Sequence, residues 1–268
     1  MPIAELPNLC MSYQEAGSGE PIVLLHGLGS CAHDWEEQIE AFASSYRVIA
    51  PDLRGHGDTD KLTRSTIAAM AEDVVQLLAE LGIQSVHVVG MSMGGMIAFQ
   101  LALDAPQLVK SLVIVNSGPD AVPRTLRHRF AIFTRFALLR VVGLPRLTRV
   151  IANKLFPASG QEMLRRRFVE RASTNDPTAY KAALDAIVSW SVADRLSSVV
   201  APTLVISADQ DYTPVSFKAD YVAKLPNARL VVIPDSRHAT PMDQPARFNA
   251  TVLEFLAGRE HRINAVAG

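Results

Sequence analysis

The sequence predicts an α/β fold built on a mostly parallel sheet, and three observations support this prediction. The chain has 268 residues, of which 49% are hydrophobic and 20% are charged, as in an ordinary globular domain. In the first 118 residues, short apolar runs alternate with longer segments of helical period. The same alternation returns after residue 200. Because parallel strands need crossover connections, this order of elements favours a central parallel sheet flanked by helices.

The expected strands are runs of a few residues that are apolar at nearly every position, which is typical of strands covered on both faces. In chain order they are residues 22–25, 48–50, 86–90, 112–115, 203–206 and 230–233. The expected helices carry apolar side chains three or four positions apart, and they are residues 34–42, 66–81, 93–103, 215–224 and 243–256. The sheet is therefore expected to break off near residue 118 and to resume near residue 203.

The segment that interrupts the sheet has the pattern of several helices. We therefore divide the chain into a core of residues 1–119 and 199–268 and an inserted helical cap of residues 120–198. Residues 120–171 hold twelve Arg or Lys but only three acidic residues, so their formal charge is +9 and that of the remaining residues is −10. This distribution predicts charge pairing between cap and core, or else attraction of an anionic substrate or membrane surface.

The overall composition argues against several classes of protein. A formal net charge of −1 is unlike that of a general nucleic-acid-binding protein, whose binding surface is strongly basic. Two cysteines, Cys10 and Cys31, are too few for a disulfide framework, so we expect reduced thiols and a cytoplasmic location. We expect no secretory leader, since residues 1–5 form neither a basic nor an apolar leader region. We also expect no transmembrane segment, since no apolar stretch approaches about 18 residues. The oligomeric state stays open.

Residues 90–94 (G-M-S-M-G) match the pattern G-x-S-x-G, which by itself is a weak signal. Here the match follows the expected strand 86–90 and leads directly into the expected helix 93–103. Such a strand–turn–helix forces the serine onto a tight turn with its hydroxyl exposed. The start of the helix adds unpaired N–H groups and partial positive charge beneath a reacting carbonyl. The pattern therefore predicts that Ser92 is a nucleophile.

A serine hydroxyl needs a base to remove its proton and an acid to orient that base. Of seven histidines, His238 is the one in a loop just beyond the last expected strand. The acid should leave the end of the preceding strand, where Asp211 is the first choice and Asp209 the second. Nucleophile, acid and base then follow one another in the chain in the order known for serine hydrolases with this type of turn.

A developing negative charge on the substrate oxygen requires two preorganised N–H donors. One is expected from Met93, the residue after the nucleophile, and the other from Leu28, in the loop that follows the strand 22–25. We interpret His26, in the same loop, as a hydrogen-bonding organiser of the loop, with a second base as the alternative.

Together these motifs resemble the α/β-hydrolase superfamily over nearly the whole chain. The resemblance is carried, in the family's usual order, by residues 26–27 (H-G), residues 52–57 (D-L-R-G-H-G), residues 90–94, Asp211 and His238. It implies an α/β-hydrolase fold with a helical cap, and a structural turn at residues 52–57 in which Arg54 and His56 form local hydrogen bonds. Carboxylesterases, enol-lactone hydrolases and non-metal perhydrolases look most similar. Arg237 stands where glycine is common, and it either meets an anionic substrate or points to solvent.

The predicted reaction is hydrolysis of a carboxylic ester or lactone through an acyl-enzyme. The expected partner is a small-molecule ester or lactone, with an anionic substrate as one option. We expect no metal or organic cofactor, because no cluster of His, Asp or Cys has convincing ligand spacing. Two alternatives stay open: a C–C bond hydrolase of meta-cleavage-type diketones with the same three residues, and a non-enzymatic receptor or scaffold.

Candidate walls of the substrate pocket are apolar side chains near the serine turn and in the predicted cap. They are Trp35, Met91, Phe130 and Phe133. Each of them fits a protein core as well as a pocket wall. Because Phe130 and Phe133 stand among arginines, a helix facing a membrane explains them equally well.

Overall fold

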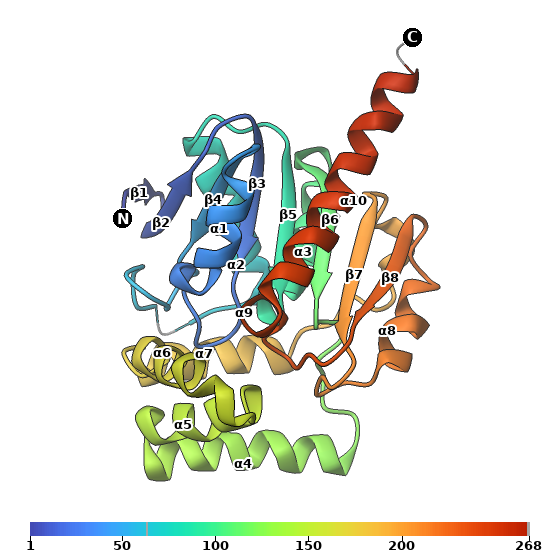
Figure 1. The fold of residues 1–268 in the computed structure, drawn as a ribbon. Helices are drawn as coiled ribbons and strands as arrows, with labels where there is room; N and C mark the ends of the chain where they lie inside the picture. Colours follow the sequence, from blue (N-terminus) through green and yellow to red (C-terminus); the bar gives the residue numbers. More distant parts are fainter. Residues whose placement is uncertain (63, 267–268) are drawn as a thin grey trace.

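The computed structural model describes residues 1–62 and 64–266, and at its centre is an eight-stranded sheet (Figure 1). The strands are β1 (Ile3–Leu6), β2 (Leu9–Ala16), β3 (Glu20–Leu25), β4 (Tyr46–Pro51), β5 (Val86–Met91), β6 (Val109–Val115), β7 (Thr203–Ala208) and β8 (Ala228–Ile233). Their order across the sheet is β1-β2-β4-β3-β5-β6-β7-β8. The strands β3 to β8 are parallel to their neighbours in this set, and they contain all six predicted runs. The prediction of a mostly parallel sheet is therefore confirmed. Residues 267 and 268, which belong to the predicted core, lie outside the described residues.

The edges of the sheet differ from its centre. β2 pairs antiparallel with β4, and β1 pairs antiparallel with β2. Sequence analysis did not predict these two strands. In β1, for example, exposed and buried side chains alternate, so the strand has no continuous apolar run. At the opposite edge, β8 is only partly buried although it is apolar apart from Arg229.

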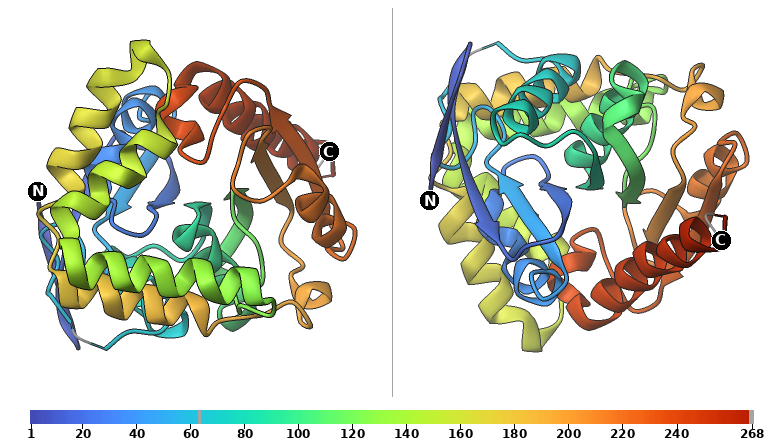
Figure 2. Two further views of the ribbon diagram at one scale, coloured as in Figure 1. Left: turned by 90° about the horizontal axis from the view of Figure 1, so that it is seen from below. Right: turned by 90° about the horizontal axis from the view of Figure 1, so that it is seen from above.

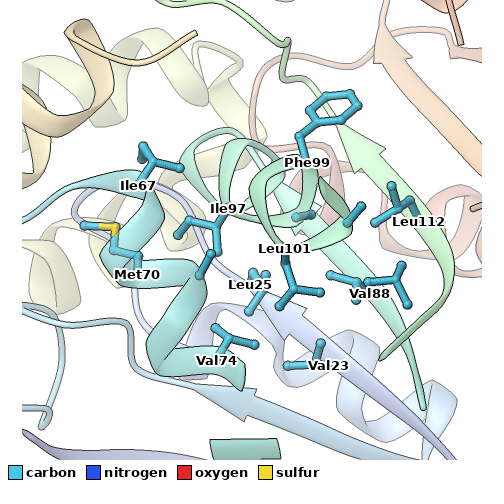
Figure 3. Close-up of a cluster of buried hydrophobic side chains, with 14 of the residues drawn as sticks. Val23, Leu25, Ile67, Met70, Val74, Val88, Ile97, Phe99, Leu101 and Leu112 are labelled. Carbon is cyan, nitrogen blue, oxygen red and sulfur yellow. The ribbon is translucent and has the colours of Figure 1, made fainter. Parts of the chain in front are cut away.

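Helices cover both faces of the sheet. The core helices are α1 (Glu36–Phe42), α2 (Ile67–Glu80), α3 (Met93–Asp104), α8 (Val215–Val222), α9 (Thr240–Asp243) and α10 (Pro245–Val266). Successive residues of a strand point to opposite faces. In β3, Val23 and Leu25 pack under α2 and α3 (Figure 3), whereas Ile22 and Leu24 pack on the other face with Phe248 of α10. Burial on both faces explains why the central strands read as continuous apolar runs.

Two predicted helices are divided or extended. The predicted helix 34–42 begins as a 3₁₀ turn, Ala32–Trp35, before α1. The predicted helix 243–256 corresponds to the end of α9 and to α10, which continues to Val266. Pro245 starts α10, and a proline in the first helical turn needs no hydrogen-bond acceptor because it has no N–H.

Four helices lie beyond the carboxyl ends of the parallel strands and cross that end of the sheet (Figures 1 and 2). They are α4 (Leu126–Val142), α5 (Leu144–Leu155), α6 (Glu162–Ala172) and α7 (Pro177–Val188). An isolated antiparallel bridge between Asp120 and Ser191 joins the two ends of this segment. Of the helices that the structure describes, none has the length and hydropathy needed to span a bilayer.

Ion pairs connect α6 to the core. The Arg171 guanidinium lies 2.9 Å from an Asp34 carboxylate oxygen and 3.0 Å from a Glu36 carboxylate oxygen. Arg167 also pairs with Glu36. Charge pairing between the basic segment and the acidic core, one of the two predicted explanations of the +9 charge, thus applies to α6.

Candidate active site

Ser92 occupies a tight turn between β5 and α3. Its backbone angles, φ 55° and ψ −115°, lie in a region that residues other than glycine seldom adopt. The Ser92 N–H donates a hydrogen bond to the Val115 carbonyl of β6 at 2.9 Å, and the Ser92 carbonyl accepts one from the Ser117 hydroxyl at 2.7 Å. Bonds to β6 and to the loop that follows it therefore hold the strained conformation in place.

Glycines at two positions allow the chain to pack closely around this turn. A Cβ atom on Gly94 would lie 2.0 Å from the Leu25 carbonyl oxygen, and one on Gly90 would lie 2.3 Å from the Gly94 carbonyl oxygen. Both distances are shorter than any allowed contact. The absence of these side chains lets the first turn of α3 lie directly against the end of β3.

The loop after β3 brings a second N–H group to this place. His26, which is buried, lies with Nδ1 2.8 Å from the Gly27 carbonyl oxygen, and its Nε2 accepts a hydrogen bond from the Leu53 N–H at 2.9 Å. Burial lowers the pKa of His26 to about 4, so the ring is neutral at pH 7 and can accept at Nε2. Because both ring nitrogens are engaged, His26 organises the loop. Among the described residues, the N–H groups of Leu28 and Met93 have no hydrogen-bond acceptor.

Asp211 and His238 lie on the loops that follow β7 and β8. His238 Nδ1 is 2.6 Å from Asp211 Oδ1, and the Asp211 side chain is only 1% exposed against 16% for His238. Burial alone would raise the pKa of the Asp211 carboxyl. The hydrogen bond and charge of His238, together with the ammonium of Lys218, outweigh burial and hold that pKa well below its usual range. The carboxylate is therefore charged, and it orients the imidazole with Nδ1 as the donor.

Lys218 is a part of this site that sequence analysis missed. Its ammonium donates hydrogen bonds to Asp211 Oδ2 at 2.5 Å, to the Thr213 carbonyl at 2.7 Å and to Thr213 Oγ1 at 2.6 Å, and the side chain is 0% exposed. Lysine is almost never fully buried unless it is paired. One feature of the sequence could have indicated its burial. Lys218 stands three residues before Tyr221 in α8, so both side chains lie on the helix face that packs against the core.

Hydrogen bonds also fix the loop that carries His238. The Asp243 carboxylate accepts bonds from Ser236 Oγ and from the Arg237 N–H, both at 2.9 Å. Asn116 Nδ2 donates to the His238 carbonyl at 2.9 Å. Burial raises the pKa of Asp243 to about 6. Arg237 thus contributes its backbone here, and its side chain does not line the cavity described next.

Ser92 and His238 line one cavity of about 490 Å³ between the core loops and the helices α4 to α7. In the part of the chain that the structure describes, no hydrogen bond joins Ser92 Oγ to the His238 imidazole. Such bonds are often long until substrate binds. Leu28 and Met91 also line the cavity, as do apolar side chains of the inserted helices, including Ala131, Leu138, Leu147, Ile151, Leu184 and Ile187. Within the described chain, no group of three or more His, Cys, Asp or Glu is arranged to hold a metal ion.

Three of the four predicted pocket residues lie elsewhere, so their prediction is corrected. Trp35 is buried in the core, where its ring packs 6.2 Å from that of Phe248. Phe130 and Phe133 point outward from α4 and are exposed. The reason is that α4 has apolar side chains on two faces. The face with Phe130 and Phe133 points to solvent, and only the second face lines the cavity. Met91 is the predicted wall residue that does line it.

The predicted role of Arg54 is also corrected. The ring of His56 does bond locally, with Nδ1 3.1 Å from the Arg54 carbonyl oxygen. The Arg54 guanidinium instead reaches Asp73 of α2, so it links the turn at residues 52–57 to a helix. A partner 19 residues away along the chain cannot be identified from the local motif.

Two basic side chains in the cavity wall lack acidic partners. Arg135 Nε donates to the Tyr180 hydroxyl at 3.1 Å, and its guanidinium lies 5.6 Å from the centre of that ring. No described carboxylate pairs with Arg135 or with Lys154. Asp34, the acidic residue in the cavity wall, is already paired with Arg171 at 2.9 Å. The wall therefore carries a surplus of positive charge.

Comparisons with known proteins agree with this architecture. Residues 20–245 match the profile of the family described as alpha/beta hydrolase fold. A protein named "Putative carbamate hydrolase RutD" from Caulobacter sp. (strain K31) is 31% identical, over 91% of this chain and 92% of that protein. The enol-lactonase from Burkholderia xenovorans LB400 shares the fold with a TM-score of 0.88 and 23% identity, over 96% of this chain and 100% of that one. Est816, described as an N-acyl homoserine lactone degrading enzyme, has a TM-score of 0.80 and 30% identity, over 95% and 100% of the two chains.

Replacing Gly94 by alanine tests the close packing around Ser92. The added Cβ would meet the Leu25 carbonyl, so we expect Gly94→Ala to lower the free energy of unfolding by about 2 kcal/mol or more. Gly160→Ala is the matched control, since no atom lies within 4 Å of a Cβ there. Chemical denaturation measures both variants. Equal stabilities would contradict the claim that the turn requires a glycine at this position.

Proposed function

Because this chain belongs to the α/β-hydrolase fold family and is a hydrolase, we propose that it cleaves a carboxylic ester or lactone through an acyl-enzyme on Ser92. The observation that carries the proposal is the 2.6 Å contact between His238 and the buried Asp211, on the wall of the cavity that Ser92 also lines. The strained turn at Ser92 adds support, because strain of this kind clusters at functional sites.

In the proposed reaction, His238 Nε2 removes the proton of Ser92, and the serine oxygen attacks the carbonyl carbon. The N–H groups of Leu28 and Met93 hold the resulting oxyanion. The imidazolium, stabilised by Asp211, then protonates the leaving alkoxide as the ester bond breaks. In the second half, His238 deprotonates a water molecule that attacks the acyl group, and Ser92 is released with its proton restored.

We assign residues 120–198 the role of a cap over a core formed by residues 1–119 and 199–268. Side chains of α4, α5 and α7 supply much of the cavity wall, while Ser92 and His238 come from the core. On this proposal the inserted helices determine the size of the acyl or alcohol group, and the core performs the chemistry.

Carbamate hydrolysis is a second candidate, suggested by the name of the relative from Caulobacter. Size and polarity of the cavity favour an ester or lactone. A volume of about 490 Å³ with a mainly apolar wall suits a substrate that carries an extended apolar group, rather than a small polar molecule such as a carbamate.

The surplus positive charge of the cavity wall points to a substrate that also carries a carboxylate. Arg135 and Lys154 have no acidic partner among the described residues, and a guanidinium binds carboxylates well. A diketone from meta-cleavage would be anionic too, so C–C bond hydrolysis is the alternative that the same charge allows. Turnover of such a diketone with simple esters left uncleaved would favour that alternative.

Removing the serine hydroxyl tests the nucleophile. We expect Ser92→Ala to lower the hydrolysis of p-nitrophenyl butyrate on the order of 10⁴-fold, because no acyl-enzyme can form. Ser44→Ala, at an exposed serine of the core, should keep full activity. A Ser92→Ala protein that is folded and as active as the wild type would show that another group attacks the ester.

Removing the guanidinium tests the anionic substrate. p-Nitrophenyl butyrate and p-nitrophenyl hemisuccinate differ in a terminal carboxylate, so they separate the charge from the ester chemistry. Arg135→Gln should lower kcat/KM for the hemisuccinate on the order of tenfold more than for the butyrate. Arg127→Gln changes an exposed arginine of the same helix and should treat both esters alike. An equal loss on both esters with Arg135→Gln would refute a carboxylate-binding role.

Removing the buried ammonium tests the charge of Asp211. With Lys218→Met, the Asp211 carboxyl loses one of the groups that lower its pKa, so that pKa should rise toward its usual range. Stability that depends on the charged carboxylate is lost as pH falls, and in the variant this loss should begin at a higher pH, as measured by thermal unfolding across the acidic range. Lys181→Met, at an exposed lysine, is the control. A Lys218→Met protein that loses stability over the same acidic range as the wild type would show that the ammonium does not hold the pKa of Asp211 low.

A further inference from the structure

The outward face of α4 is apolar and uncovered. Leu126, Phe130, Phe133 and Val141 are 84%, 70%, 67% and 79% exposed. A helix turns by about 100° per residue, so these four positions fall within an arc of about 80°. They form what we call the α4 stripe. In Figure 1, α4 is the helix farthest from the sheet, on the outside of the molecule. Large apolar side chains that are exposed together along one face of a helix mark an interaction site.

The charge around the α4 stripe has one sign. Residues 126–155, which form α4 and α5, hold seven Arg or Lys and no acidic residue. By helical position, Arg129 and Arg140 flank the stripe on one side and Arg127 on the other. All three are exposed, and none pairs with a carboxylate in the part of the chain that the structure describes.

This surplus is confined to α4 and α5. On α6, the arginines that face the core are neutralised, since Arg167 and Arg171 pair with Glu36. Pairing with the core therefore accounts for part of the +9 charge of residues 120–171 and leaves the basic groups around the α4 stripe unexplained.

The charge decides between the possible occupants of the α4 stripe. A second copy of this chain, packed stripe against stripe about a two-fold axis, would bring arginines against arginines, with no acidic residue of 126–155 to separate them. A bilayer surface with anionic headgroups satisfies both features, because the acyl boundary accepts the apolar side chains and the phosphates accept the arginines. We infer that α4 docks this protein, in the plane of the interface, on an anionic lipid surface.

Docking through α4 would place the cavity close to the lipid surface. The adjacent face of α4, with Ala131, Thr134, Arg135 and Leu138, lines the cavity that holds Ser92. A docked molecule would hold this cavity one helix away from the lipid surface. The docking itself rests only on the α4 stripe and its arginines, and it holds whatever reaction the cavity supports.

Vesicle co-sedimentation of the full chain tests the inference. We expect binding to phosphatidylcholine vesicles with about 30% phosphatidylglycerol and little binding to pure phosphatidylcholine. The bound fraction should fall as salt rises from about 0.05 to 0.5 M, because screening weakens the arginine contacts. The double variant Phe130→Ser/Phe133→Ser should bind about tenfold more weakly. Val200→Ser removes an apolar side chain that is 63% exposed outside the inserted helices, and it should bind as the wild type does.

Each other outcome overturns the inference. Failure of the wild type to bind anionic vesicles does so, as does equal binding by a folded double variant, with folding checked by circular dichroism. Light scattering identifies the competing occupant: a dimer that the double substitution dissociates, without vesicle binding, would assign the α4 stripe to a second copy. Because no substrate is used, failure of the proposed hydrolysis would leave these results unaffected.

Discussion

The candidate site depends on one steric constraint, the approach of the first turn of α3 to the ends of β3 and β5. Gly94 and Gly90 permit contacts that any side chain would block, and the chain between them turns through the left-handed conformation of Ser92. The free N–H groups of Leu28 and Met93 come from the two segments that this contact joins. A hydroxyl and two unpaired N–H groups are thus held near one another by backbone packing.

A second constraint is electrostatic. Asp211 is buried between an imidazole and an ammonium, with His238 on one carboxylate oxygen and Lys218 on the other. An unpaired carboxylate at this depth would be strongly destabilising, and Lys218 removes that penalty. The same ammonium competes with His238 for the negative charge. Both groups lower the pKa of Asp211, so the loops after β7 and β8 are joined through a charged carboxylate.

Features set by residues close together in the chain could be predicted from the sequence, whereas features set by partners far apart in the chain could not. The central strands could be predicted because each is buried on both faces and therefore has a continuous apolar sequence. The position of Ser92 in a tight turn could be predicted because it lies between such a strand and a helix. Lys218 and the Arg54–Asp73 link were missed because each depends on partners that only the folded chain brings together. Phe130 and Phe133 were assigned to the wrong side of α4, since a helix with two apolar faces does not reveal which one is inward. The catalytic roles of Ser92, Asp211 and His238 stay predictions.

Covalent labelling measures the central claim most directly. A fluorophosphonate reacts with a serine hydroxyl only where a base activates it and donors hold the phosphoryl oxygen. The account predicts one labelled peptide in the intact protein, with the mass increase on Ser92, and a loss of ester hydrolysis in proportion to labelling. Unlabelled Ser92 in a protein that continues to hydrolyse esters would contradict it.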